Sequence, residues 1–300
     1  MPSIAKEIRA LQRLAPIGDH IEDSLRDATR HALNTEGSFS RAKLAGGLAE
    51  ELGLSKRYAE NLGGSIELFH LASLLLDDLP CMDNAETRRT KSCTHLLYGD
   101  NATILSALGL INQAYFHLWK LFATKEQSIQ EEAARITHEC LGFQGILDGQ
   151  SKDINYYFSR NSQERVAEIA EKKTGSLFRL CLLLPAVLTE ASRYEKLQLA
   201  NLARDWGLTY QITDDLKDLY YSDSISGKSS HKDAELGRPN MALAIGEVAT
   251  ATLLDNLINR SQANIESLKR SKRGIYTTLE EFQNGIVEKV TPLLQAFAAA

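Results

Sequence analysis

Apolar residues recur at the spacing of one helix face along almost the whole chain, and no segment shows convincing strand alternation. The 300 residues include only 6 prolines and 19 glycines, so few positions interrupt these periodic segments. The pattern therefore predicts an all-α protein. We expect helices over residues 19–34, 40–52, 56–79, 101–122, 128–150, 162–189 with a kink at Pro185, 194–218, 241–268 and 277–297.

No linker, low-complexity tract or exact repeat divides the chain. We therefore expect a single domain over residues 1–300. In it, a bundle of about ten or more helices would surround a central active-site cavity. A hydrophobic content of 43% is ample for such a core.

The overall charge and the cysteines exclude several classes of protein. A net charge of −5 argues against a general nucleic-acid binder. The four cysteines lack C-x-x-C spacing, which favours reduced thiols in a cytoplasmic protein over a disulfide framework or a zinc site. The N-terminal segment is charged throughout, unlike a signal peptide. The longest apolar stretch, near residues 180–188, is too short for a membrane span.

Two clusters of aspartate stand where apolar helical segments would otherwise continue. They contain Asp77, Asp78 and Asp83, and then Asp214, Asp215 and Asp218. Asp214 and Asp218 share one helix face, where like charges repel by roughly 0.2–0.5 kcal/mol. Burial raises that cost further, so we expect cations between the clusters. Oxygen-only ligands suit Mg²⁺, which keeps several waters and is usually completed by substrate phosphates.

A loop rich in Ser, Gly and Lys, residues 222–240, follows the second cluster and contains Lys228 and Arg238. A basic loop beside an acidic site favours a lid that orders when phosphate binds. An ordinary surface loop is the alternative.

Several motifs occur in the order found in the trans-isoprenyl diphosphate synthases, or polyprenyl synthetases, and the chain resembles that family, in particular its bacterial geranylgeranyl and farnesyl diphosphate synthases. The first motif, D-D-x-x-x-x-D with an Arg pair, is matched by Asp77, Asp78, Asp83, Arg88 and Arg89. The second, Q-x-x-D-D-x-x-D, is matched by Gln211, Asp214, Asp215 and Asp218. Between and after these stand Gly149, Gln150, Asp153, Lys173, Thr174, Gly175, Gly227, Lys228, Asp233 and Arg238.

The resemblance implies an isoprenoid synthase fold and the condensation of an allylic prenyl diphosphate with isopentenyl diphosphate. The six aspartates would hold Mg²⁺, about three ions together with the substrate diphosphate. Arg88, Lys173 and Lys228 would hold the allylic diphosphate, and Arg238 would be a further substrate-binding residue. Gln211 and Thr174 would place oxygen dipoles near the cationic carbon. Relatives are usually homodimers, so the resemblance also implies a second copy of this chain.

The binding site for isopentenyl diphosphate departs from the family pattern. Arg41, His70 and Arg89 match family contacts, although His70 could equally be a satisfied core histidine. Ser38 replaces a family Lys. A lost charge-assisted contact is worth about 1.5–3 kcal/mol, or roughly ten- to a hundred-fold in affinity. Leu76, Thr90 and Leu108 are further departures.

This departure leaves two alternatives to a chain-elongating prenyltransferase. One is a terpene cyclase or unusual coupling enzyme that does not use isopentenyl diphosphate. The other is a non-catalytic subunit of a prenyl synthase, against which the intact aspartate clusters argue.

Product length depends, by resemblance, on the residues four and five positions before the first aspartate. These are Ser73 and Ala72, both small, while Tyr115 and Phe116 are candidates to close the cavity further down. We expect a C20 product, with C15 as the alternative.

Overall fold

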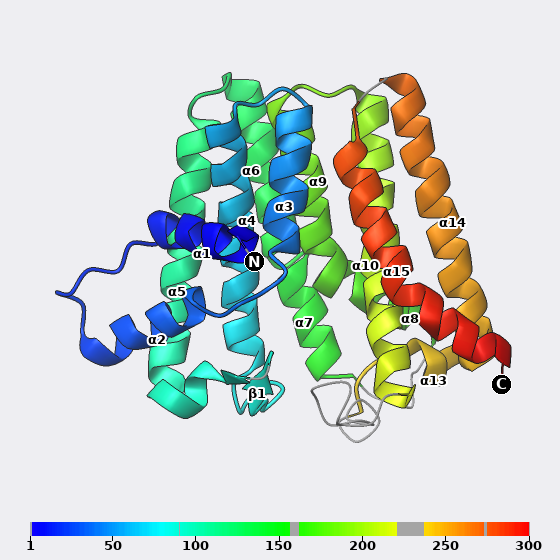
Figure 1. The fold of residues 1–300 in the computed structure, drawn as a ribbon, viewed down its shortest axis with the longest axis horizontal. Helices are drawn as coiled ribbons and strands as arrows, with labels where there is room; N and C mark the ends of the chain where they lie inside the picture. The colour runs from blue at the N-terminus through cyan, green and yellow to red at the C-terminus, as the bar shows by residue number, and fades with distance from the viewer. Residues whose placement is uncertain (1, 90, 157–161, 221–236, 273–274, 300) are drawn as a thin grey trace. The chain divides into compact units, whose positions relative to one another are not determined.

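Helices make up most of the described structure. It is a computed structural model that describes residues 2–89, 91–156, 162–220, 237–272 and 275–299 (Figure 1). The only strands among them are β1 (Thr87–Arg88) and β2 (Lys91–Ser92), a two-residue antiparallel pair in which Thr87 lies opposite Ser92. The described structure is 79% helical, and the all-α prediction is confirmed.

The chain divides into two compact units. The first contains residues 1–50 and 54–130, and the second contains residues 51–53 and 131–300. The single domain over residues 1–300 and its central cavity stay predictions. In the described part of the chain, no helix is both long enough and apolar enough to cross a membrane.

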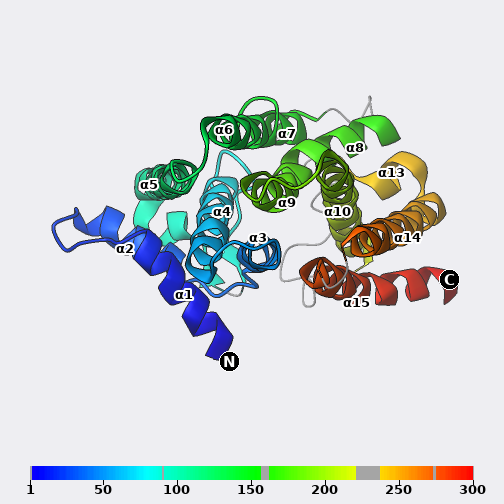
Figure 2. The ribbon, with the colours of Figure 1, turned by 90° about the horizontal axis from the view of Figure 1, so that it is seen from above.

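The first unit is built around two long helices. Its helices are α1 (Pro2–Leu14), α2 (Asp23–Leu33), α3 (Ser40–Glu51, whose last residue belongs to the second unit), α4 (Lys56–Asp77) and α5 (Thr94–Phe122). Helix α4 packs along α5, while α2 lies against α5 and α1 lies against α4 (Figure 2). Because its end carries the first aspartate cluster, α4 is the element that positions this part of the site.

Glycines let α3 approach α4 closely. A Cβ atom at Gly63 of α4 would collide with the carbonyl oxygen of Ala42, and one at Gly46 of α3 would lie 3.3 Å from the carbonyl oxygen of Ala59. Only residues without a side chain fit at such a crossing. The N-terminal turn of α3 is therefore held against the middle of α4.

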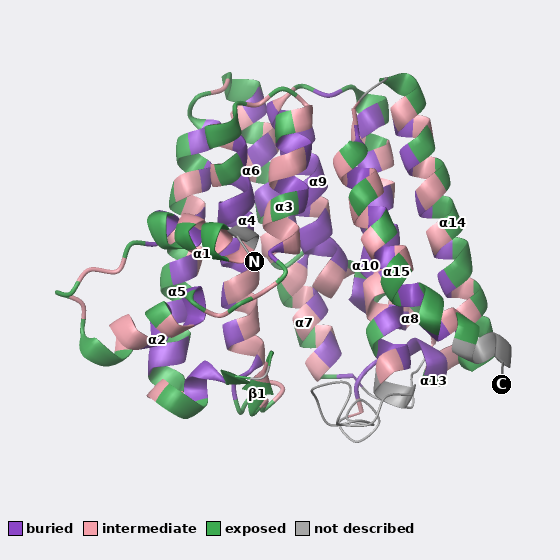
Figure 3. Cartoon of the chain, in the orientation of Figure 1, coloured by how far each residue is buried: buried purple, intermediate pink, exposed green. Residues whose placement is uncertain are grey.

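The second unit surrounds one central helix, α10 (Arg193–Tyr220). Its other helices are most of α6 (Gln127–Leu141), then α7 (Ile146–Ile154), α8 (Gln163–Ala170), α9 (Ser176–Leu188), α13 (Met241–Ile245), α14 (Glu247–Ser271) and α15 (Thr277–Ala299). Helix α10 packs against α9 and α14 and also contacts α8, α13 and α15 (Figure 2). Trp206 and Phe282 form its aromatic core at 4.7 Å between ring centroids. Figure 3 shows that α9 is buried along nearly its whole length.

A π-helical turn, Glu171–Gly175, joins α8 to α9. There Gly207 of α10 meets the backbone of Gly175, because a Cβ atom at Gly207 would lie 2.6 Å from the Gly175 Cα. Such turns are rare in proteins, and those that occur are often found at functional sites. The turn contains Lys173 and Thr174, so the backbone of one predicted motif is fixed by a glycine–glycine contact.

The helix boundaries differ from the predicted ones where glycine or proline was misjudged. Gly246 (φ 84°) has left-handed backbone and separates α13 from α14 inside the predicted helix over residues 241–268, whereas Gly99 (φ 83°), which interrupts α5, lies before the predicted helix over residues 101–122. Helices α6 and α7 are separate, and Gly145 stands between them, so the predicted helix over residues 128–150 was too long. Helix α9 runs through Pro185 to Leu188, and the departure from α geometry lies earlier, in the π turn. Helix α1 was not predicted at all.

Candidate active site

The first aspartate cluster lies at the end of α4 in the first unit. Asp77 is the last residue of that helix, and the Asp83 N–H donates to the Asp77 carbonyl oxygen at 2.9 Å. The intervening residues therefore fold back and place Asp83 next to the helix end. Asp77 and Asp83 are both half-buried.

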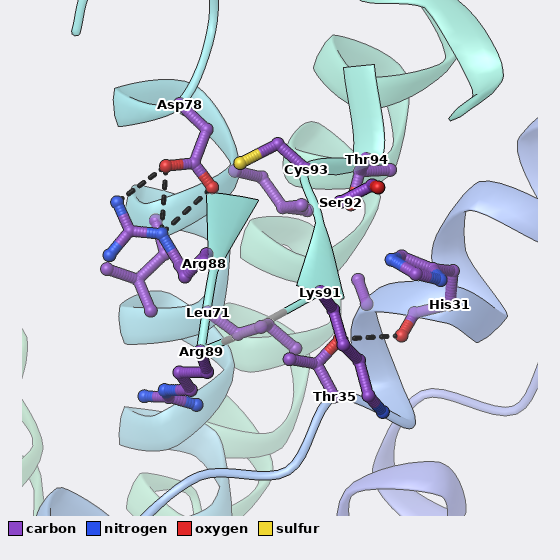
Figure 4. Close-up of a pocket in the computed structure, with 13 residues that line it drawn as sticks. His31, Thr35, Leu71, Asp78, Arg88, Arg89, Lys91, Ser92, Cys93 and Thr94 are labelled. Atoms are coloured by element: carbon purple, nitrogen blue, oxygen red, sulfur yellow. Dashed lines mark hydrogen bonds and ion pairs between the residues drawn. The ribbon is translucent and has the colours of Figure 1, made fainter. Parts of the chain in front are cut away.

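Asp78 is engaged differently from its neighbours. The residue is only 4% exposed, and its carboxylate accepts from Arg88 Nε at 2.8 and 2.9 Å and from Arg88 Nη2 at 2.5 Å (Figure 4). Arg88 reaches it from β1, and such a bidentate pair fixes both side chains. In this structure Arg88 thus holds an aspartate at the place where we expected a diphosphate.

Arg41, His70 and Arg89 gather in the first unit. Arg41 Nη1 lies 3.1 Å from His70 Nε2, and His70 and Arg89 line one pocket. A guanidinium can only donate, so His70 Nε2 accepts and Nδ1 carries the proton. Burial, and after it the charges of Arg41, Arg89 and Arg88, hold the pKa of His70 well below its ordinary value. His70 is therefore neutral at pH 7.

Ser38 directly follows two loop residues, Glu36 and Gly37, that lie next to the Arg89 guanidinium. The Arg89 Nη1 donates to the carbonyl oxygen of Glu36 at 3.0 Å, and a Cβ atom at Gly37 would collide with the same guanidinium. Ser38 itself is exposed. Ser38, which replaces the family lysine, therefore belongs to a loop segment that contacts Arg89, one of the residues predicted to bind isopentenyl diphosphate.

Glu67 is a buried acid that the sequence analysis missed. It stands on α4 one turn before His70, is 5% exposed, and lines the same pocket as His70 and Arg89. Its Oε2 accepts from the Ala42 N–H at 2.9 Å. Burial raises the pKa of Glu67, while the Ala42 N–H and the charges of Arg41 and Arg89 oppose that shift. The signal was present as the one charged residue in the apolar segment 62–69.

The second aspartate cluster lies near the end of α10 in the second unit. Asp214 is exposed and lies 3.4 Å from Lys217 Nζ. Asp215 is fully buried, accepts from the Gln211 side-chain amide at 2.9 Å, and accepts from the Met241 N–H at 2.7 Å. Asp215 therefore ties the start of α13 to α10. The backbone of Asp218 is helical, and its side chain is not among those described.

Lys173 and Asp153 bring two of the predicted motifs into contact. Lys173 Nζ lies 2.6 Å from Asp153 Oδ2, and Arg238 Nη1 lies 3.5 Å from the same oxygen. A Cβ atom at Gly149 would collide with the backbone of Lys173. Asp153, buried on α7, thus holds two of the cations that we expected around a diphosphate. Thr174 is half-buried in the same π turn.

Lys228, and most of the loop predicted as a lid, lie outside the described residues. Arg238 lies just after this gap and is 8% exposed. Asn240 follows it and caps α13 by accepting from the Leu243 N–H at 3.1 Å. The cap and the Asp215 contact together fix the chain where it re-enters the described structure.

The two small residues below the first motif are both on α4. Ala72 is fully buried, and the Ser73 hydroxyl donates to the His70 carbonyl oxygen at 2.8 Å. Tyr115 of α5 packs edge-on against Phe69, with 4.9 Å between ring centroids. Phe116 is 52% exposed, so within this chain it does not contribute to a buried floor.

The aspartate carboxylates are suitable ligands for Mg²⁺, although they do not form a complete metal-binding site by themselves. Within the described ranges, no three His, Cys, Asp or Glu side chains lie close enough together to hold a metal ion. Asp77, Asp83 and Asp214 offer at least partly exposed carboxylates, whereas Asp78 and Asp215 are bonded to protein groups. Mg²⁺ usually takes one or two carboxylates and completes its shell with water and phosphate. The residues present therefore fit this ion.

Comparisons with known proteins agree with the motifs. The polyprenyl synthetase family model matches residues 22–274. Geranylgeranyl pyrophosphate synthase 4 of Arabidopsis thaliana is 29% identical over 289 residues, which cover 95% of this chain and 72% of that protein. Geranylgeranyl diphosphate synthase of Pseudescherichia vulneris is 32% identical over 208 residues, which cover 68% of this chain and 65% of that protein.

Solved structures show the same fold. A geranyltransferase from Helicobacter pylori, solved in complex with magnesium and isoprenyl diphosphate, matches with a TM-score of 0.73 and 23% identity over 97% of this chain and 98% of that chain. At that identity the likeness shows the fold alone. Since the family match spans most of the sequence and carries the aspartate motifs, the chain belongs to the polyprenyl synthetase family and is a trans-prenyltransferase.

Proposed function

We propose that this prenyltransferase condenses an allylic prenyl diphosphate with isopentenyl diphosphate, uses Mg²⁺, and releases a C20 diphosphate. The observation that carries the proposal is the gathering of Arg41, His70 and Arg89 in the first unit. An enzyme that only ionises an allylic diphosphate needs no second diphosphate site. The names of the related geranylgeranyl diphosphate synthases support the C20 product.

The proposed reaction has three steps. The allylic C–O bond breaks, and pyrophosphate leaves with the bonding pair. The double bond of isopentenyl diphosphate then attacks the allylic carbocation and forms a new C–C bond. Finally, the released pyrophosphate removes a proton from the coupled cation, which gives a longer allylic diphosphate.

The chain's own residues assist the first step by holding the leaving group. Arg88 and Lys173 would contact the departing pyrophosphate, which requires them to exchange Asp78 and Asp153 for phosphate oxygens. Bound Mg²⁺ would neutralise the charge that develops on the pyrophosphate. Asp77, Asp83 and Asp214 are the proposed direct ligands of Mg²⁺. Asp78, Asp215 and Asp218 are the other three of the six aspartates that the sequence predicts at the metal site.

Two oxygen dipoles are proposed to face the carbocation. The Gln211 amide nitrogen donates to Asp215, which orients the side chain and leaves its carbonyl oxygen as an acceptor. Thr174, in the π turn, would supply the second dipole. Such preorganised dipoles stabilise charge without reorganisation when the charge appears.

One experiment tests this function against both alternatives. The purified protein is incubated with Mg²⁺ and a C10 or C15 allylic diphosphate, with and without isopentenyl diphosphate, and the products are identified. We expect a C20 diphosphate only when isopentenyl diphosphate is present. A hydrocarbon or alcohol formed without it would favour a cyclase, and no turnover would favour a non-catalytic subunit.

We also propose that the enzyme is a homodimer joined along α5. Beyond the break at Gly99, one face of this helix exposes large apolar side chains, about half of each, at Ile104, Leu105, Leu108, Phe116 and Trp119. Residues at this spacing form one stripe, and an exposed stripe of this kind marks an interaction surface. Leu105→Glu with Leu108→Glu should halve the mass in sedimentation, while Val248→Glu, at an exposed apolar position on α14, should not. A wild-type monomer would contradict the proposal.

A cytoplasmic location is part of the same proposal, because the spacing of the cysteines is typical of reduced thiols. Cell fractionation tests it.

A further inference from the structure

Glu67 is a buried acidic residue, and a carboxylate in such a position must be stabilised by its neighbours. It is 5% exposed, on α4, in the middle of the first unit's core. Buried carboxylates are rare unless charged or polar groups compensate them. Glu67 lies outside the motifs that this chain shares with the family, so its neighbours must explain it.

The first of these neighbours is the N-terminal turn of α3. The Lys43 N–H donates to the carbonyl oxygen of Phe39, the residue just before α3, at 3.0 Å, and the preceding Ala42 N–H has no acceptor inside the helix. Glu67 Oε2 supplies that acceptor at 2.9 Å. The bond is possible because Gly63, one turn earlier on α4, lets the Ala42 backbone approach so closely.

The second set of neighbours is cationic. Arg41 immediately precedes Ala42 in the same turn, and Arg89 lines the pocket together with Glu67. Both guanidinium groups lie near enough to act on the ionisation of Glu67. His70, one turn further along α4, accepts from Arg41 and is neutral, so it supplies no charge of its own. Glu67 is therefore a buried carboxylate that interacts electrostatically with two guanidinium groups beside a neutral imidazole.

We propose that Glu67 is a positioning residue for the diphosphate of isopentenyl diphosphate. Through the Ala42 N–H it holds the turn that carries Arg41, and through its charge it keeps Arg41 and Arg89 oriented before the substrate arrives. This inference rests on the proposed function, because it concerns the proposed binding site for isopentenyl diphosphate. Because such cations are already ordered, less conformational entropy is lost when the ligand binds.

The test is steady-state kinetics of Glu67→Gln in the full chain, with a C15 allylic diphosphate and Mg²⁺. Gln can still accept from the Ala42 N–H but carries no charge. We expect the KM for isopentenyl diphosphate to rise about ten-fold, as for one weakened charge-assisted contact, while the KM for the allylic substrate changes less than about two-fold. Glu60→Gln, an exposed position on the same helix, is the matched control and should leave both constants unchanged.

A second comparison separates positioning from simple structural support. In an Arg89→Gln background only one guanidinium remains to be oriented, so the effect of Glu67→Gln should become smaller. If Glu67→Gln fails to fold, Glu67→Asp replaces it. The shorter side chain keeps the charge but loses its reach to the Ala42 N–H, and the KM for isopentenyl diphosphate should rise about three-fold.

Several outcomes would overturn the role of Glu67. They are an unchanged or lowered KM for isopentenyl diphosphate in the variant, an equal rise for both substrates, or full additivity with Arg89→Gln. Wild-type turnover that does not need isopentenyl diphosphate is a different result, because it rejects the proposed function itself and the acceptor subsite with it.

Discussion

Lys173 and Asp153 form a partly buried ion pair of 2.6 Å between the π turn and α7, and Arg238 contacts the same carboxylate oxygen at 3.5 Å. Three motifs that are far apart in the sequence thus meet at one side chain. Asp153 therefore contributes to the orientation of both cations.

Asp153→Asn should weaken the binding of the allylic diphosphate more than it weakens the fold. The amide keeps the shape but not the charge that orients Lys173 and Arg238, and a charge-assisted contact is worth about 1.5–3 kcal/mol. We expect kcat/KM for the allylic substrate to fall about ten- to a hundred-fold. Steady-state kinetics checks this, and an unchanged kcat/KM would show that the pair has no part in substrate binding.

The two adjacent aspartates of α10 should respond differently to alanine. Asp214→Ala removes an exposed carboxylate, so we expect turnover to fall at least about a hundred-fold with no change in thermal stability. Asp215→Ala removes the buried acceptor of the Met241 N–H and should also cost about 2–3 kcal/mol of unfolding free energy. Denaturant unfolding of both variants distinguishes them, and equal stability of the two would contradict the anchoring role of Asp215.

Ser38→Lys should strengthen the use of isopentenyl diphosphate. The position is exposed on the loop that contacts Arg89, so a lysine can be added without disturbing the core. One added charge-assisted contact should lower the KM for isopentenyl diphosphate about ten-fold. A KM that does not move would favour the reading in which this co-substrate is not used.

Ala72→Phe should shorten the product from C20 towards C15. Ala72 is fully buried on α4, so the larger ring should also cost about 1–3 kcal/mol of stability through overpacking. Product analysis by chromatography reads the first effect and thermal unfolding reads the second. Ser73→Ala is the control and should leave the product distribution as it is, whereas an unchanged distribution in Ala72→Phe would refute this geometry.

His70 should make the fold less stable at acidic pH. Its pKa is lowered in the folded protein, so between that lowered value and the ordinary value near 6.5 the unfolded chain binds more protons than the folded one. The free energy of unfolding therefore falls as the pH drops below about 6.5, by at most about 1.4 kcal/mol per pH unit. His70→Gln should flatten this slope in urea unfolding between about pH 7.5 and 5.5, and identical slopes would contradict the expectation.

The sequence predicted the helical class and most of the long helices, because their apolar periodicity is strong and few residues interrupt it. It also identified Arg41, His70 and Arg89 as one group, which the first unit brings together. The periodicity could not separate α6 from α7, since Gly145 looks like any other helix glycine until its backbone is seen.

The partners of the site residues were beyond reach of the sequence. Nothing in the spacing of Asp78 and Asp215 shows that one bonds Arg88 and the other the Met241 N–H. Each contact forms because a later segment of the chain folds back against the end of a helix. The spacing of motifs does not specify where such a segment will lie. Glu67 was missed for a related reason, because its significance lies in its distance from Ala42, 25 positions earlier in the chain.

The π turn at Glu171–Gly175 has a consequence for the length of the chain. It accommodates one residue more than an α-helical turn would. Deleting one residue here would restore a continuous helix and rotate everything beyond the deletion by about 100° around its axis. Either Lys173 would turn away from Asp153 or the buried face of α9 would turn outward. At this place the enzyme depends on the number of residues as well as on their identity.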